Sequence, residues 1–402
     1  MNVSRRIVLA SAASAFVPSI ARAQEAPIRI GVLGDQNGPY ADFSGPGCAI
    51  AARLAAEDFG GHVLGRPVEI LSADHRNKPE LAVSIAREWI DNQGVQAVLE
   101  TSTSGAAMAL QPMMREKKRI FLIVIAGTSD LTNKACSPFG FHFNCDTYAL
   151  AHSTGGAVTK MGGNSWFFIT VDYAFGHALE RDTSRFVTEA GGKVLGSVRH
   201  PLGNADFSSY LQQAQSSGAK VIAFANAGAD AQNAIKQAVE FGMNQDGRRL
   251  VALLFFITDV LAIGLPKANG LVLTNTFYWD QSDATRQWTK RFMAHKGRVP
   301  SMNQAAAYAS ARHFLRAVQS AGTTETERVA DTMRALPVED MYNDHAPIRA
   351  DGRVLSRMYL MQAKAPAASR YPGDVYNILG STPGAEAFRP VAESECNLLQ
   401  KA

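Results

Sequence analysis

The sequence predicts an α/β protein with two lobes, each built on a parallel β-sheet that is covered by helices on both faces. Three observations lead to this expectation. The chain has 402 residues, of which 46% are hydrophobic, so it is long enough to form at least two ordinary cores. Short β-branched runs alternate with amphipathic helical stretches, and this alternation starts a second time after Asp146. Parallel strands joined by helical crossovers form sheets of this kind.

The first lobe is expected to begin with the strand nearest the N-terminus. Apolar, β-branched runs predict strands at 28–33, 68–73, 96–99 and 120–125. Between these runs, apolar residues recur at helical spacing and predict helices at 47–59, 79–91 and 104–117. Each helix therefore serves as the crossover between two parallel strands.

The second lobe repeats this arrangement. Its predicted helices are at 149–161, 174–190, 208–217 and 231–241. Its predicted strands are at 166–171, 193–198, 221–225 and 250–256.

The rest of the chain changes character. One more strand is expected at 271–275, followed by helices at 284–295, 303–321 and 326–335 and by strand-like segments near 354–361. A chain that builds one lobe, crosses to a second, returns and crosses again would leave this pattern. The short connecting segments would then act as hinges beside a cleft.

The N-terminus has the three-part layout of a cleaved signal peptide. Arg5 and Arg6 make its start basic, residues 7–16 are apolar, and the Ala-Arg-Ala ending at 21–23 predicts cleavage after residue 23. We therefore expect residues 1–23 to direct export to the periplasm. The paired arginines resemble a twin-arginine signal, and an ordinary secretory signal fits the same residues equally well.

Charge and hydropathy exclude several classes of partner. The formal net charge is +4, and three of the basic residues lie in the signal, so the mature chain is close to neutral. A neutral surface has no electrostatic footprint for nucleic acid or anionic lipid. The most apolar later segment, 250–265, is interrupted by Thr258 and Asp259, so no stable membrane insertion is expected after the signal.

The sequence carries none of the motifs that would indicate an enzyme, a cofactor or a metal. It has no GxSxG elbow, no HExxH, no Walker loop and no GxGxxG after the first strand. The nine histidines lack ligand spacing, and no CxxC pair occurs among Cys48, Cys136, Cys145 and Cys396. In an exported protein these cysteines are expected to form one or two disulfides, and their spacing alone does not determine the pairing.

Several stretches along the chain together resemble one family. The first lobe contains IRIGVLGDQNGPYADFSGPGCAIAARLAAEDFGG, then ETSTSGAAMALQ and VIAGTSDLT. The second lobe opens with SWFFITVDYAFGHALERD and continues with VLGSVRHPLGNADFSSYLQQAQSSGAKVIAFANAGADAQNAIKQA and GLVLTNTFYWD. In order and spacing, over most of residues 27–390, these stretches resemble the leucine/isoleucine/valine-binding group of type I periplasmic solute-binding proteins.

The resemblance implies two Rossmann-like lobes of the periplasmic binding protein type I fold, a ligand cleft between them and a three-segment hinge. Lobe 1 is then expected to comprise 24–145 plus 276–345, and lobe 2 to comprise 146–275 plus 346–402. The protein is expected to be a monomer that captures a small carboxylate ligand and delivers it to the permease and ATPase of an ABC importer. A ligand-sensing receptor domain for a regulator or chemoreceptor is the alternative.

The resemblance also bears on the disulfides. It places Cys136 and Cys396 where a bridge can tie the C-terminal tail to the body of the protein. Cys48 and Cys145 form a second candidate pair.

Two loops rich in hydroxyl groups are candidates for holding a ligand carboxylate. Thr103 and Ser104 lie between a predicted strand and the N-terminus of a predicted helix, where free amides and the helix dipole favour an anion. Ala126, Gly127 and Thr128 follow the next strand, and the family places a carboxylate-binding Thr at the position of Thr128. Helix capping or a simple turn is the alternative explanation for both loops.

Aromatic residues at strand ends are candidates for the walls of the site. Tyr40 follows the first strand, Tyr173 and Phe175 follow the strand that ends at residue 171, and Trp279 follows the strand that ends at residue 275. Open α/β sheets bind ligands at such strand ends. A place in the hydrophobic core is the alternative for each of them.

The chain departs from the amino-acid binders of the family. Phe175 stands where those proteins have a Tyr, and the stretch that begins at Asn226 places Ala227 where they have another. The Glu that pairs with the ligand ammonium has no clear counterpart, and Asp259 is the nearest acid. Because an unpaired buried charge is costly, we expect a carboxylic acid without an α-amino group, with aromatic acids leading and aliphatic acids next. A branched-chain amino acid becomes acceptable if Asp259 faces the cleft.

Overall fold

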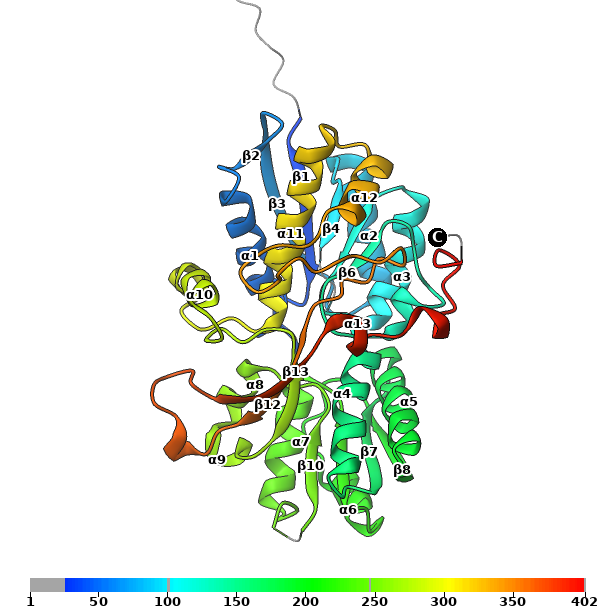
Figure 1. The fold of residues 1–402 in the computed structure, drawn as a ribbon, viewed down its shortest axis with the longest axis vertical. Coiled ribbons are helices and arrows are strands. Elements are labelled where there is room, and N and C mark those ends of the chain that lie inside the picture. The colour runs from blue at the N-terminus through cyan, green and yellow to red at the C-terminus, as the bar shows by residue number, and fades with distance from the viewer. Residues whose placement is uncertain (1–25, 100–101, 246, 401–402) are drawn as a thin grey trace, which may run out of the picture.

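The computed structural model describes residues 26–99, 102–245 and 247–400. The expected signal peptide (1–23) and its paired arginines lie outside the described residues. The described chain forms two α/β lobes stacked along the long axis of the molecule (Figure 1), which confirms the expected fold class.

The first lobe is built on a six-stranded sheet with the order β2-β3-β1-β4-β5-β6. The strands are β1 (Ile28–Gly34), β2 (His62–Val63), β3 (Arg66–Asp74), β4 (Ala97–Leu99), β5 (Ile120–Ile123) and β6 (Gly140–His142). All neighbours pair in parallel except β2 and β3, which form an antiparallel hairpin. Successive residues of a strand point to opposite faces, so Ile30 and Val32 enter one core and Leu33 enters the other.

Helices cover both faces of this sheet. One face carries α1 (Gly45–Glu57), α10 (Asp283–Lys296), α11 (Met302–Ala321) and α12 (Thr326–Ala335). The other face carries α2 (Pro79–Gln93) and α3 (Ser104–Glu116). Proline and glycine set the ends of α2, because Pro79 stands at its start and Gly94 adopts a φ of 64° just after its end.

The second lobe is built on a four-stranded parallel sheet with the order β10-β9-β7-β8. Its strands are β7 (Ser165–Val171), β8 (Lys193–His200), β9 (Val221–Ala225) and β10 (Arg249–Ala252). Its helices are α4 (Thr147–Lys160), α5 (Ala174–Glu189), α6 (Ser208–Ser216), α7 (Gly228–Glu240), α8 (Ile257–Ile263) and α9 (Leu265–Ala268). The strand expected at 250–256 pairs with β9 only as far as Ala252, so residues 253–256 continue as a loop.

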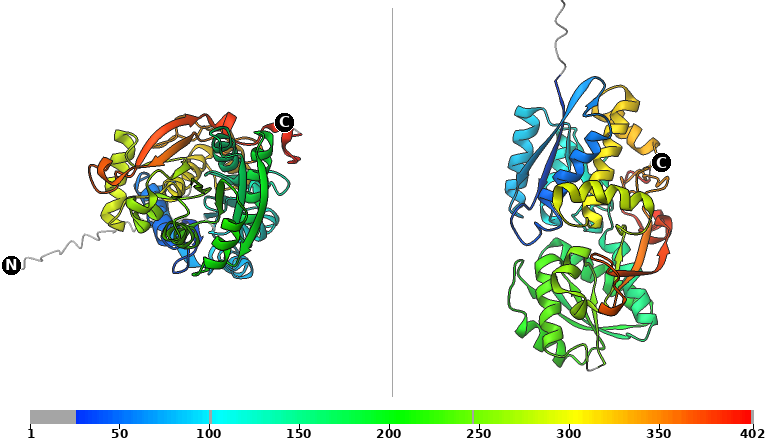
Figure 2. Two further views of the ribbon diagram at one scale, coloured as in Figure 1. Left: turned by 90° about the horizontal axis from the view of Figure 1, so that it is seen from below. Right: turned by 90° about the vertical axis from the view of Figure 1, so that its left-hand side faces the viewer.

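A third, antiparallel sheet consists of β11 (Val272–Asn275), β12 (Met358–Ala363) and β13 (Tyr376–Thr382). The sequence did not predict β13, whose side chains are mostly exposed and therefore lack a buried apolar stripe. The side view in Figure 2 shows β12 and β13, coloured orange to red, along one side of the joint between the lobes. The short α13 (Gly384–Ala387) follows them.

Apart from the C-terminal tail, three segments connect the lobes: 143–146 before α4, 276–282 after β11, and 353–357 before β12. The expected division placed residues 346–402 in the second lobe, but residues 346–356 contact the first lobe. Arg353 bridges His142 in β6, and Val354 N donates to His142 O at 3.1 Å. The outer edge of β6 would otherwise leave backbone groups without partners, which is costly when they are buried.

The C-terminal tail also returns to the first lobe. Cys136 and Cys396 form a disulfide, which confirms the pairing that the resemblance implied. Cys145 carries a buried thiol, so the second candidate bridge with Cys48 is not formed. Within the described ranges, no helix is both long and apolar enough to cross a membrane.

Candidate functional site

A small cavity of about 10 Å³, partly open to solvent, lies between the lobes. Each of its walls is a loop at the carboxyl end of a parallel strand, as is usual for ligand sites in open α/β sheets. The first lobe contributes Tyr40, Phe43, Ser102, Ser104, Ile125 and Gly127. The second lobe contributes Tyr173, Phe175, Ala227, Leu254 and Phe256. The two sheets thus meet at one site although their residues are far apart in the sequence.

The N-terminus of α3 reaches the cavity through Ser104. The hydroxyl of Thr103 caps this helix, because Ala106 N donates to Thr103 Oγ1 at 3.3 Å. Ser104, the first residue of the helix, lines the cavity instead, and its Oγ accepts a hydrogen bond of 3.1 Å from Thr128 N. The capping alternative is therefore true of Thr103, whereas Ser104 lines the cavity.

A buried polar network holds the loop that carries Tyr40. Asp35 N donates to Ser102 Oγ at 2.8 Å, and the hydroxyls of Ser44 and Ser102 are hydrogen-bonded to each other. The carboxylate of Asp35 accepts from Tyr40 N at 3.0 Å and from Asn77 Nδ2 at 2.7 Å. This network fixes the Tyr40 loop and the Ser102 hydroxyl at the same edge of the sheet.

Two tyrosines join the lobes across the cavity. The hydroxyls of Tyr40 and Tyr173 are 2.9 Å apart and hydrogen-bonded. Burial raises the pKa of Tyr40 well above its ordinary value and also raises the pKa of Tyr173, so both hydroxyls stay protonated near neutral pH. At Gly228, which has a φ of 59°, an added Cβ would lie 2.8 Å from Pro39 O of the other lobe. The lobes are therefore in direct contact, in a closed arrangement.

Aromatic rings form most of the remaining wall. The ring centres of Phe43 and Phe256 are 4.5 Å apart, those of Tyr40 and Phe43 are 5.2 Å apart, and those of Tyr173 and Phe175 are 6.1 Å apart. Among the described residues that line the cavity, none carries a carboxylate or a cationic side chain. The site therefore offers flat apolar walls with a few hydroxyl groups.

Six of the site residues expected from the sequence do not line this cavity. Thr103 and Ala126 lie beside lining residues, and the Thr128 hydroxyl accepts from Asp130 N at 3.4 Å at the start of a 3-10 helix. Asn226 is buried against His200, with Asn226 Nδ2 3.1 Å from His200 Nε2. Trp279 donates from Nε1 to Gly373 O at 2.9 Å, outside the cavity.

Asp259, the sixth, caps α8 instead of facing the cavity. Its carboxylate accepts from Phe256 N at 2.8 Å and from Gln232 Nε2 at 2.6 Å. Burial raises the pKa of Asp259 to about 7. Both of its oxygens are thus occupied by groups of its own lobe.

Several residues that line the cavity were not expected from the sequence. They are Phe43, Ser102, Ile125, Ala227, Leu254 and Phe256. Ser102 and Ala227 lie in stretches that carried the family resemblance, so proximity to those motifs was an available signal. Leu254 and Phe256 fell within a predicted strand, and no pattern in the sequence indicated that β10 ends at Ala252.

The chain is similar to known proteins over most of its length. A family model described as periplasmic binding protein matches residues 27–369. Leu/Ile/Val-binding protein homolog 6 of Brucella melitensis is 26% identical over 256 residues, which are 63% of this chain and 64% of that relative. The chain thus matches slightly less than two thirds of that relative's length.

Two solved structures are similar over both lobes. A periplasmic binding protein from Burkholderia mallei is 45% identical, with a TM-score of 0.90 and coverage of 92% of this chain and 99% of that chain. A branched chain amino acid ABC transporter periplasmic ligand-binding protein from Burkholderia xenovorans LB400 is 35% identical, with a TM-score of 0.83 and coverage of 92% and 100%.

Proposed function

The chain belongs to the periplasmic binding protein family, and from this premise we propose that it captures a small aromatic carboxylic acid for an ABC importer, without requiring an α-amino group. The observation that carries this proposal is the lining of the cavity, which combines aromatic and aliphatic walls with hydroxyl groups and holds no charged side chain among its described residues. The cavity of about 10 Å³ is smaller than a ligand of one ring or a short branched chain, so such a ligand requires the lobes or the lining side chains to move apart.

Ser104 and the start of α3 are the proposed carboxylate site. The first amides of a helix have no acceptor within the helix, and together with the dipole they favour an anion. Ser104 Oγ accepts from Thr128 N, and in this proposal its own proton is donated to a ligand oxygen. Ser102 stands at the same edge and adds a second hydroxyl.

The cavity wall formed by Leu254 and Phe256 favours a ligand without an amine. Leu254 and Phe256 occupy the loop after β10, and Asp259 is hydrogen-bonded within its own lobe. An ammonium placed among these residues would be buried without a partner, at a cost of several kcal/mol. A ligand that lacks the amine avoids this cost.

A branched-chain amino acid is the second candidate, since the Brucella melitensis relative is named a Leu/Ile/Val-binding protein homolog and the Burkholderia xenovorans protein a branched chain amino acid ABC transporter protein. Pairs of ligands that differ only in the amine separate the two. One pair is phenylalanine with 3-phenylpropanoate, and the other is leucine with 4-methylpentanoate. A ligand that binds only the folded protein raises its thermal midpoint, by the equivalent of about 2.7 kcal/mol at one hundred times Kd. We expect the amine-free member of at least one pair to raise the midpoint more than the amino acid of that pair does. Benzoate is tested as a further acid without an amine. A shift with leucine and none with any of the amine-free acids would refute the proposed ligand class.

Delivery to a permease and its ATPase completes the proposed function, with the mature protein acting as a monomer in the periplasm. Uptake of the labelled acid by cells with and without the gene tests this step. Loss of uptake in the deletion strain is expected. Normal uptake together with a lost transcriptional or chemotactic response to the acid would favour the sensory alternative.

A further inference from the structure

The three segments that connect the lobes are tied together by one buried side chain, Asn144 in the first segment. Its Oδ1 accepts from Thr276 Oγ1 in the second segment at 2.9 Å. Its Nδ2 donates to Asn303 Oδ1 in α11 of the first lobe at 2.7 Å. Its backbone oxygen accepts from Nη1 of Arg353, at the start of the third segment. One residue thus bonds to both other segments and to the first lobe.

Arg353 extends this network into the second lobe. Its side chain is fully buried, and Nη2 lies 3.3 Å from Asp146 Oδ2. Asp146 is the N-cap of α4, the first helix of the second lobe, since Ala149 N donates to Asp146 Oδ1 at 2.9 Å. The ion pair therefore crosses the boundary between the lobes.

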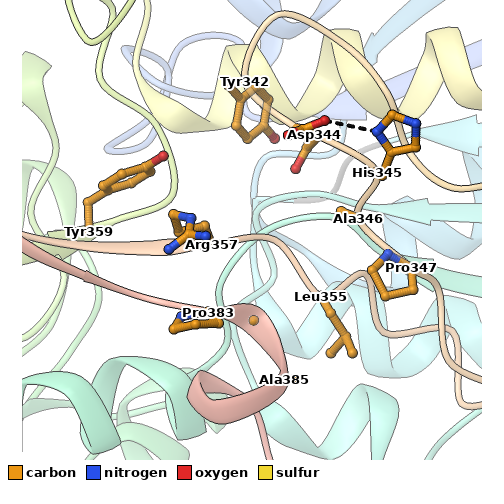
Figure 3. A pocket seen from close by; sticks show the side chains of 12 residues that line it. Tyr342, Asp344, His345, Ala346, Pro347, Leu355, Arg357, Tyr359, Pro383 and Ala385 are labelled. Atoms are coloured by element: carbon orange, nitrogen blue, oxygen red, sulfur yellow. Dashed lines mark hydrogen bonds and ion pairs between the residues drawn. The ribbon is translucent and has the colours of Figure 1, made fainter.

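The surroundings hold the guanidinium in place. The ring of Phe388, beyond β13, covers Arg353 with its centre 4.6 Å from the guanidinium carbon. By contrast, the residues just after Arg353 have space on one side. They border an open pocket of about 490 Å³, whose lining includes Leu355, Arg357 and Tyr359 (Figure 3).

We propose that Asn144 and Arg353 are positioning residues for lobe closure, which hold the three connecting segments in the arrangement that brings the cavity walls together. This inference rests on the proposed function, in which the lobes close around a ligand. Neither residue lines the cavity, so their effect on binding would be indirect.

The network joins groups on different connecting segments, Thr276 with Asn144 and Arg353 with Asp146. Rotation of one lobe against the other is expected to change the relative positions of these segments. A hydrogen bond made in only one arrangement shifts the balance between open and closed molecules by about five-fold. A smaller closed fraction weakens apparent affinity in the same proportion.

Small-angle X-ray scattering of the mature protein without ligand tests the proposal. Thr276→Val removes the hydroxyl while keeping the shape of the side chain, and Arg353→Lys keeps the charge but loses the planar guanidinium. Thr154→Val is the matched control. Thr154 is equally buried and loses a hydroxyl contact to Thr274 Oγ1 at 3.2 Å, but it lies within the second lobe. Besides the bond to Asn144, Thr276→Val loses a weak contact of 3.6 Å to Met302 Sδ.

We expect a larger radius of gyration for Thr276→Val and Arg353→Lys than for Thr154→Val. We also expect faster hydrogen exchange in cleft peptides that contain Tyr40 and Gly228. If Arg353→Lys does not fold, Thr276→Val carries the test alone. The proposal would be overturned if Thr276→Val and Arg353→Lys lowered the unfolding midpoint as the control does but left the radius of gyration and the hydrogen exchange of the cleft peptides unchanged. Because no ligand is used, failure of the proposed ligand class would not affect this result.

Discussion

Removal of the Ser104 hydroxyl is the most direct test of the proposed carboxylate site, and removal of the Thr128 hydroxyl is its control. Ser104→Ala removes the only side-chain oxygen of this helical turn that lines the cavity among the described residues. Thr128 follows the lining residue Gly127 but does not itself line the cavity. Thr128→Val removes its hydroxyl, which accepts a long hydrogen bond of 3.4 Å from Asp130 N. The bond from Thr128 N to Ser104 survives this second change because it comes from the backbone.

The expected magnitudes differ clearly. A hydrogen bond to a charged group contributes about 1.5 to 3 kcal/mol, so Ser104→Ala should weaken binding of a carboxylate by about ten- to 150-fold. Thr128→Val should change affinity by no more than about two-fold, as expected for a residue away from the ligand. Ser104→Ala also leaves Thr128 N without its partner, which should cost about 1 to 3 kcal/mol of stability.

Isothermal titration calorimetry with the acid that gives the largest thermal shift measures both variants. Titrations are made well below the unfolding midpoint of each variant, because the stability loss must not be mistaken for lost affinity. Wild-type affinity in Ser104→Ala, or an equal loss in Thr128→Val, would refute the assignment of Ser104 as the carboxylate ligand.

Three further predictions concern the amine wall, the disulfide and a buried acid. Leu254→Glu places a carboxylate in the cavity wall and should reverse the preference between 4-methylpentanoate and leucine in calorimetry, whereas Leu254→Gln should not. Reduction of the Cys136–Cys396 bridge, or replacement of both cysteines by Ser, opens a loop of 260 residues and should lower the free energy of unfolding by up to about 5.5 kcal/mol in urea titrations; an unchanged value would contradict this. Burial raises the pKa of Asp259 to about 7 from an ordinary 3.8, so the folded state binds this proton more tightly than the unfolded state does. Its contribution to stability is full below about pH 4 and is lost as the pH rises through about 7, and urea titrations should show a smaller decline in Asp259→Asn than in the wild type.

The sequence by itself determined the fold class and the general location of the site. Apolar runs such as 120–123 and 221–225 are buried strands because only a sheet with two covered faces can accommodate them. The alternation of strands and helices then places the strand ends, and hence Tyr40, Ser104 and Tyr173, at one edge of each sheet. The bridge between Cys136 and Cys396 followed from family resemblance and not from spacing.

Only the tertiary structure decided which of the residues at these strand ends face the cavity. Thr103 and Ser104 are adjacent and both carry hydroxyls, yet one caps its helix and the other lines the site, because successive residues at a helix start point in different directions. Asp259 turns to Gln232 because a buried carboxylate must find donors, and the nearest ones lie within its own lobe. Leu254 and Phe256 reach the cavity because β10 ends early and the two lobes close on each other. These outcomes depend on contacts between segments far apart in the chain, which local periodicity does not encode.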